Sequence, residues 1–133
     1  MTKAIQAIYD TNVFVAAGFN RRSASARLIQ AARDGKIRMI WCKATRAEIE
    51  RILTKIPPLD WEAVADVFRH EVEAPDPDPA TAAFVTDPED RKFAALSLAA
   101  GTPIISADSD LTVHAGRLDV WSAGAFWTAY MAE

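Results

Sequence analysis

The sequence predicts an α/β fold, a three-layer α/β/α sandwich built around a central parallel sheet. Short apolar segments at residues 4–9, 37–41 and 103–106 have the composition of strands buried on both faces, and residues 118–121 are a fourth candidate. Longer segments with helical apolar spacing separate these strands along the chain. Strands that alternate with helices form parallel sheets covered on both sides. The length favours a single domain, residues 1–133.

The helical segments are recognised by their apolar spacing and by the residues at their ends. Residues 23–34 are amphipathic and stop at Gly35, a common residue directly after a helix. The next helix has isoleucine and leucine at helical spacing up to residue 56, and Pro57 and Pro58 end it. Residues 123–131 are expected to form the last helix.

The second half of the chain is predicted to have two further helices joined by a loop. Residues 60–72 have an apolar stripe at helical spacing, which predicts one continuous helix. The alternating Asp and Pro of residues 74–79 do not fit a helix interior or a central strand, so they predict a surface connection. Asp87 followed by Pro88 is typical of a helix start, and that helix would end at Gly101.

The charges are unevenly distributed along the chain. Lysine and arginine number 15, aspartate and glutamate number 18, and the net charge of −3 argues by itself against a polyanionic partner. However, residues 1–55 contain 11 basic and four acidic side chains, whereas residues 56–133 contain four basic and 14 acidic ones. The total therefore hides a basic half and an acidic half.

Composition also excludes several classes of protein. Cys42 is the only cysteine, so neither a disulfide framework nor a cysteine-based zinc site can form within one chain. No apolar run approaches the roughly 18 residues of a membrane span. Asp10 follows the N-terminus too closely to leave room for a secretory segment. These features favour a cytoplasmic protein without a membrane partner.

The informative residues are acids at the ends of predicted strands. Asp10 follows the first strand, and Asp108 and Asp110 follow the third. Because the carboxyl ends of parallel strands share one edge of a sheet, these acids are expected to meet there. Clustered carboxylates repel one another unless a cation neutralises them, and oxygen ligands favour Mg²⁺ or Mn²⁺ over zinc. One or two such ions can promote phosphodiester hydrolysis.

Each acid also has a purely structural explanation. Asp10 could be a turn residue, and Asp108 could be the N-cap of a short helix. Capping and the helix dipole account for Asp87 and Asp90, and capping is the preferred explanation of Asp87. Glu48 ends a Thr-x-x-Glu pattern that is typical of a capping box.

Four short motifs occur in a fixed order over nearly the whole chain. They are Tyr9-Asp10-Thr11-Asn12-Val13, Ala47-Glu48-Ile49-Glu50-Arg51-Ile52-Leu53, Asp87-Pro88-Glu89-Asp90-Arg91-Lys92-Phe93 and Ile104-Ile105-Ser106-Ala107-Asp108-Ser109-Asp110-Leu111. In this order they resemble the motifs of the PIN-domain family of metal-dependent ribonucleases, in particular the VapC-like toxins of type II toxin–antitoxin pairs. The resemblance implies a PIN-like sandwich, and it selects Glu48 over Glu50, which helical periodicity leaves open.

The resemblance also implies roles for individual residues. The catalytic quartet would be Asp10, Glu48, Asp90 and Asp108. The direct ligands of Mg²⁺ or Mn²⁺ would be Asp10, Asp90 and Asp108, with Glu48 and Asp110 completing the site or recruiting a second ion. Hydrogen bonds from Thr11 or Asn12 and from Ser106, which stands where the family usually has Thr, would support the carboxylates.

The resemblance implies a single-stranded RNA substrate, a small antitoxin protein as partner and a homodimer. Arg21 and Arg22 could hold the RNA backbone, although they could equally be ordinary surface charges. If residues 1–55 surround Asp10 and Glu48, the basic surface is expected to adjoin the acidic pocket.

Two other interpretations of the sequence compete with the prediction of a ribonuclease. A Toprim-like phosphoryl-transfer domain also ends a strand in Asp-x-Asp, but it requires Glu where this chain has Asp10. The standard nucleotide-binding glycine motifs are absent. The second alternative is an inactive PIN-like module that binds RNA or protein, and retention of all four acids argues against it.

Overall fold

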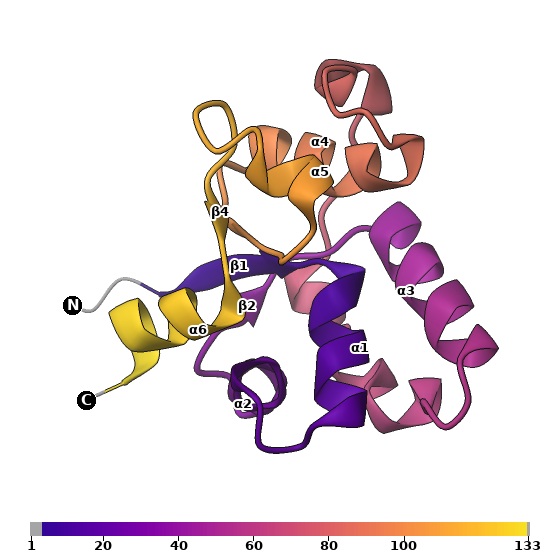
Figure 1. Cartoon of the computed structure of the whole chain (residues 1–133), viewed down its shortest axis with the longest axis vertical. Helices are drawn as coiled ribbons and strands as arrows, with labels where there is room; N and C mark the ends of the chain where they lie inside the picture. The colour runs from indigo at the N-terminus through magenta and orange to yellow at the C-terminus, as the bar shows by residue number, and fades with distance from the viewer. Residues whose placement is uncertain (1–3, 133) are drawn as a thin grey trace.

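The computed structural model describes residues 4–132, which form a parallel sheet covered by helices on both faces (Figure 1). All neighbouring strands are parallel, and their order across the sheet is β2-β1-β3-β4. The strands are β1 (Gln6–Tyr9), β2 (Arg38–Met39), β3 (Ile104–Ile105) and β4 (Val120–Trp121). The predicted three-layer α/β/α sandwich is confirmed.

In Figure 1 two sets of helices lie on opposite sides of the sheet. The first set is α1 (Thr11–Phe19), α2 (Ala24–Arg33) and α3 (Lys43–Lys55). The second set is α4 (Arg91–Ala100) and α5 (Ser109–Thr112). The C-terminal helix α6 (Ala123–Phe126) continues as a wider π-helical turn, Trp127–Met131, and packs against α2.

Most helices of the structure begin and end at or near the residues predicted from the sequence. The Ser23 hydroxyl caps α2 by accepting a hydrogen bond from the backbone N–H of Ala26 at 3.1 Å. Gly35 and Gly101 follow α2 and α4 with φ angles of 77° and 59°. These angles lie in the left-handed region, which glycine adopts without steric cost, so both helices stop there.

The predicted continuous helix over residues 60–72 is wrong. That segment instead forms three short 3₁₀ helices, Trp61–Ala63, Ala65–Val67 and His70–Val72. Side chains from elsewhere donate to backbone carbonyls of this segment, and one of them is the Ala63 carbonyl, which a helix over residues 60–72 would pair with the Val67 N–H. Arg33 donates to the Ala63 carbonyl at 2.9 Å, and the Trp41 indole N–H donates to the Arg69 carbonyl at 2.8 Å. Tertiary hydrogen bonds therefore override the local helical pattern.

Helix α1 was not anticipated, because its residues are apolar on nearly every side and show no helical periodicity. It starts directly after Asp10 and buries Val13 and Phe14.

The loop predicted at residues 74–79 leads into a short 3₁₀ helix, Pro79–Ala82.

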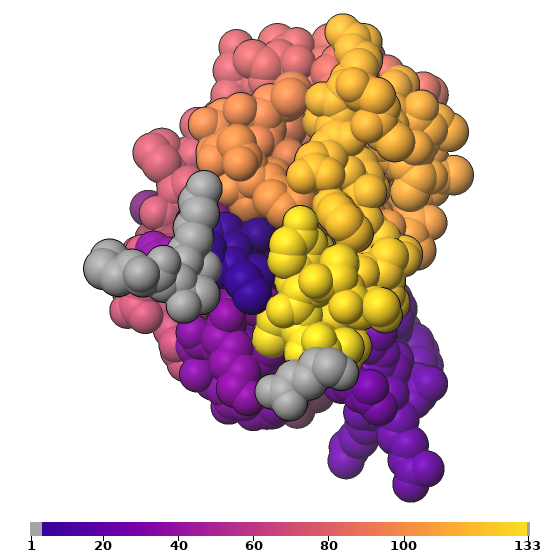
Figure 2. Space-filling model, turned by 90° about the vertical axis from the view of Figure 1, so that its left-hand side faces the viewer, coloured from indigo at the N-terminus to yellow at the C-terminus, as the bar shows by residue number. Residues whose placement is uncertain are grey.

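The sheet forms the centre of the hydrophobic core. The last three residues of β1 are buried, and Figure 2 shows only a small part of this indigo strand between later segments of the chain. Within residues 4–132 no helix has both the length and the apolar character that a membrane span requires.

Candidate metal centre

The carboxyl ends of β1 and β3 form the topological switch point of the sheet. The chain leaves β1 to reach β2 on one side, then crosses back to β3 on the other side of β1. Ligands bind at such points in open α/β sheets, because the diverging connections leave a crevice there. Asp10 directly follows β1, and Ser106 and Asp108 follow β3.

A hydrogen-bond network joins these two strand ends. The Ser106 hydroxyl donates to Asp10 Oδ2 at 2.6 Å and accepts from the backbone N–H of Asp108 at 3.0 Å. The other oxygen of Asp10 accepts from the backbone N–H of Thr11 at 2.8 Å. Asp10 is only 2% exposed, so these donors replace the water that a carboxylate normally has. Thr11 thus supports the Asp10 carboxylate through its backbone N–H. The side chain of Asn12 is exposed.

Replacing Ser106 by alanine is expected to lower the free energy of unfolding of the metal-free protein by about 1–3 kcal/mol, because a buried carboxylate loses its closest donor. Ser106→Thr keeps the hydroxyl and should stay close to wild type. Urea unfolding at neutral pH measures both. Equal stability of the alanine and threonine variants would contradict the supporting role of this hydroxyl.

A second group of carboxylates is formed by Asp87, Asp90 and Asp110. One oxygen from each lies within 4.8 Å of the other two. Asp90 is buried, and its Oδ2 has no hydrogen-bond partner. An unpartnered, buried carboxylate oxygen beside two further carboxylates fits a hard divalent cation, which prefers oxygen ligands.

Burial and mutual repulsion change the pKa values of these acids. Burial raises the pKa of Asp10 to about 6, against the lowering effect of the bonds from Ser106 and Thr11. The pKa of Asp90 is raised to about 8 by burial, then by Asp108, with smaller contributions from Asp10 and Asp87. Raised pKa values of this kind are typical of buried, clustered carboxylates and are frequent at functional sites.

The structure thus brings most of the predicted acids to one edge, in an arrangement that the sequence did not specify. Asp10 and Asp108 are joined through Ser106, whereas Asp90 and Asp110 group with Asp87. Asp87 was interpreted only as a helix cap, and it does accept a hydrogen bond from the Glu89 N–H at 3.0 Å. Asp87 is the N-cap of a short 3₁₀ helix, Pro88–Asp90, and this single turn brings it close to Asp90.

Glu48 is not a helix-capping residue. Helix α3 begins at Lys43 with Cys42 as N-cap, and Thr45 occupies the third position of the capping box. Glu48 therefore lies in the body of the helix, where it forms an ion pair with Arg51. Glu48 is buried, and its charge makes the smallest of the contributions to the raised pKa of Asp10.

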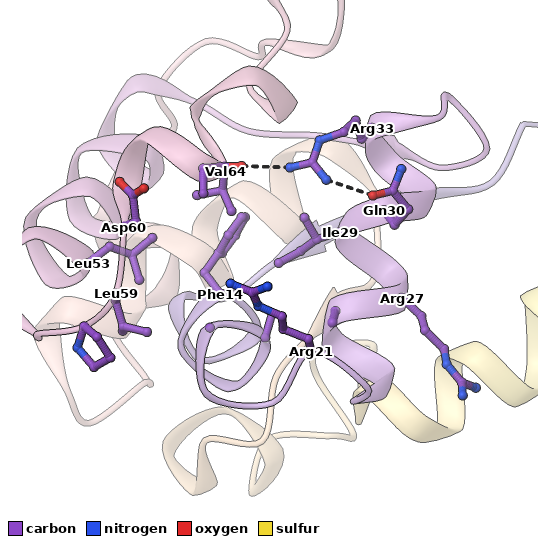
Figure 3. A pocket seen from close by; sticks show the side chains of 15 residues that line it. Phe14, Arg21, Arg27, Ile29, Gln30, Arg33, Leu53, Leu59, Asp60 and Val64 are labelled. Carbon is purple, nitrogen blue, oxygen red and sulfur yellow. Dashed lines mark hydrogen bonds between the residues drawn. The ribbon is translucent and has the colours of Figure 1, made fainter.

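Arg21 and Arg22 lie away from the acids. Asp10 caps the first end of α1, and the two arginines follow its other end, about 13 Å along a nine-residue helix. Arg21 lines a cavity of about 580 Å³ whose walls include Phe14, Ile29 and Leu59 (Figure 3). No acid of the metal centre lines this cavity.

Comparison with known proteins decides the family. A model of the family described as "PIN domain" matches residues 6–109, which is most of the chain. The chain belongs to the PIN-domain family. Its fold is similar to that in the crystal structure of PAE2754 from Pyrobaculum aerophilum, with a TM-score of 0.64 over 98% of this chain and 92% of that one. The two sequences are 14% identical, so this likeness concerns the fold alone. No curated protein sequence matches the chain significantly.

Membership in the PIN-domain family agrees with the acids at the switch point. PIN domains are typically metal-dependent nucleases, and this chain has an acidic group that could hold a divalent metal. The matched range includes Asp10, Glu48, Asp90 and Asp108.

Proposed function

We propose that this PIN domain is an endoribonuclease that uses Mg²⁺ or Mn²⁺ to hydrolyse phosphodiester bonds of single-stranded RNA. The observation that carries the proposal is the unpartnered, buried Oδ2 of Asp90 beside Asp87 and Asp110, at the switch point of the sheet. Nitrogen and sulfur ligands are absent from this group, and a set of carboxylates alone suits these two ions.

The carboxylates of the site and Ser106 would have different roles. Asp90, with Asp110 and Asp87, would hold the cation from one side, and Asp108 and Asp10 would face it from the ends of β3 and β1. When bound, the cation lowers the pKa of a water molecule and offsets the charge of the reacting phosphate. Ser106 and the Thr11 N–H fix both oxygens of Asp10, so its orientation is set before substrate arrives.

We also propose that the chain is the toxin of a toxin–antitoxin pair. The support is the resemblance of its four motifs to those of VapC-like toxins. A small antitoxin protein and a second copy of the chain are the partners that this role implies, and the cytoplasm is the corresponding location. Induced expression should then stop bacterial growth, and co-expression of the antitoxin that this role requires should restore it.

Metal removal tests the nuclease itself. EDTA should abolish cleavage of an end-labelled single-stranded RNA, and excess Mn²⁺ or Mg²⁺ should restore it, because the carboxylates cannot activate water without the cation. A single-stranded DNA of the same sequence is the substrate control, and Asp10→Asn is the protein control. Cleavage that survives both EDTA and Asp10→Asn would contradict the mechanism. A protein that binds RNA but does not respond to metal would instead be a binding module.

A further inference from the structure

Both oxygens of the Glu48 carboxylate are held by a single arginine. Arg51, three residues later on α3, donates from Nη2 to Oε1 at 2.7 Å and from Nε to Oε2 at 2.9 Å. This bidentate geometry is the strongest that a guanidinium and a carboxylate form. Lys92 on α4 adds a more distant positive charge, with its Nζ 3.9 Å from Oε2, while its closer partner is Glu89.

This pairing separates Glu48 from the other acids. The Glu48 side chain is only 8% exposed and lies near enough to Asp10 to affect its pKa. Nevertheless it is not among the described carboxylates whose oxygens lie within 4.8 Å of one another. The Arg51 side chain is 46% exposed, so its guanidinium has solvent into which it can move.

We propose that Arg51 is an internal counter-cation that competes with the divalent metal ion for Glu48. In the metal-free protein Arg51 neutralises Glu48, and Glu48 turns toward the acidic site only after Arg51 has released it. The released guanidinium then lies at the edge of the site, where a planar, bidentate donor suits an RNA phosphate. This inference rests on the proposed metal-dependent function.

The same helix offers a matched control. Arg46 pairs with Glu50 at 3.2 Å, and their side chains are 39% and 43% exposed. Arg46→Ala removes one positive charge and one ion pair from α3, as Arg51→Ala does, but it leaves Glu48 and its partner intact. General loss of charge and specific release of Glu48 can therefore be distinguished.

The test is calorimetric titration of Mn²⁺ into the metal-free protein at constant pH. Arg51→Ala should bind Mn²⁺ about threefold to tenfold tighter than wild type, because Glu48 loses its bidentate partner and keeps only the more distant Lys92. Arg46→Ala should bind as wild type does. In a Glu48→Gln background, Arg51→Ala should have no further effect, since the residue for which Arg51 and the metal compete is gone.

The outcomes separate this inference from the proposed function. Wild-type affinity in Arg51→Ala, with Mn²⁺ still bound, overturns the competition alone. An Arg51→Ala effect that persists in the Glu48→Gln background would show long-range charge instead, and it also overturns the competition. A wild-type protein that binds no Mn²⁺ overturns both proposals.

Discussion

Asp90→Asn is expected to reduce metal-dependent RNA cleavage at least about a hundredfold, because it removes the acid whose buried oxygen lacks a partner. An amide nitrogen cannot bind the cation, and the remaining carboxylates would hold it less tightly. The same change should stabilise the metal-free protein at pH 8, since the side chain no longer brings a negative charge next to Asp108 and Asp10. Lost activity with increased stability is the signature of an acid retained for function.

Glu89→Gln is the matched control for Asp90→Asn. Glu89 is the adjacent acid, but it is exposed, and its pKa is lowered by a hydrogen bond from Lys92. Its replacement should leave cleavage within about twofold of wild type and should not stabilise the protein. Initial rates on labelled RNA and thermal unfolding in EDTA measure the two effects. An Asp90→Asn protein that is active, or is less stable than wild type without metal, would show that Asp90 is a structural residue.

Sequence patterns predicted the elements whose signals are local. Gly35, Gly101 and Pro57 act on their own backbone, so the helix ends that they mark could be placed from the sequence. Helix α1 was missed because nearly all of its residues are apolar, so its exposed side has no polar pattern that marks a helix. The error at residues 60–72 has a different cause, because the distant Arg33 takes the Ala63 carbonyl, which a continuous helix would use internally.

The sequence predicted site roles for Asp10, Glu48, Asp90, Asp108 and Asp110, but it predicted neither Asp87 as a member of the acidic group nor the partner of each carboxylate. Their meeting at one edge follows from parallel topology, which alternating strands and helices already imply. The choice of partner for each carboxylate depends on side-chain rotamers and on packing between α3 and α4. Spacing could not show that Arg51 holds Glu48, or that Asp87 joins Asp90 and Asp110.

The metal-free protein is expected to lose stability as the pH rises from 5 to 9. The pKa values of Asp10 and Asp90 are raised to about 6 and about 8, from 3.8, so both carboxyls hold protons more tightly when folded than when unfolded. Their stabilising contribution is therefore complete below pH 3.8 and is lost as the pH passes through 6 and then 8. Each pH unit through which one of these protons is lost costs about 1.4 kcal/mol, so we expect a total loss of several kcal/mol between pH 5 and 9.

Bound metal should reverse this dependence on pH. A divalent cation binds the deprotonated carboxylates, so Mn²⁺ should stabilise the protein more at pH 8 than at pH 5. Urea unfolding in EDTA and in Mn²⁺ at both pH values measures the four free energies, and Asp90→Asn should flatten the curve in EDTA. If stability in EDTA instead rose from pH 5 to 8, the buried acids would be compensated within the protein itself. They would then need no cation, and no electrostatic reason for a metal ion at this edge of the sheet would remain.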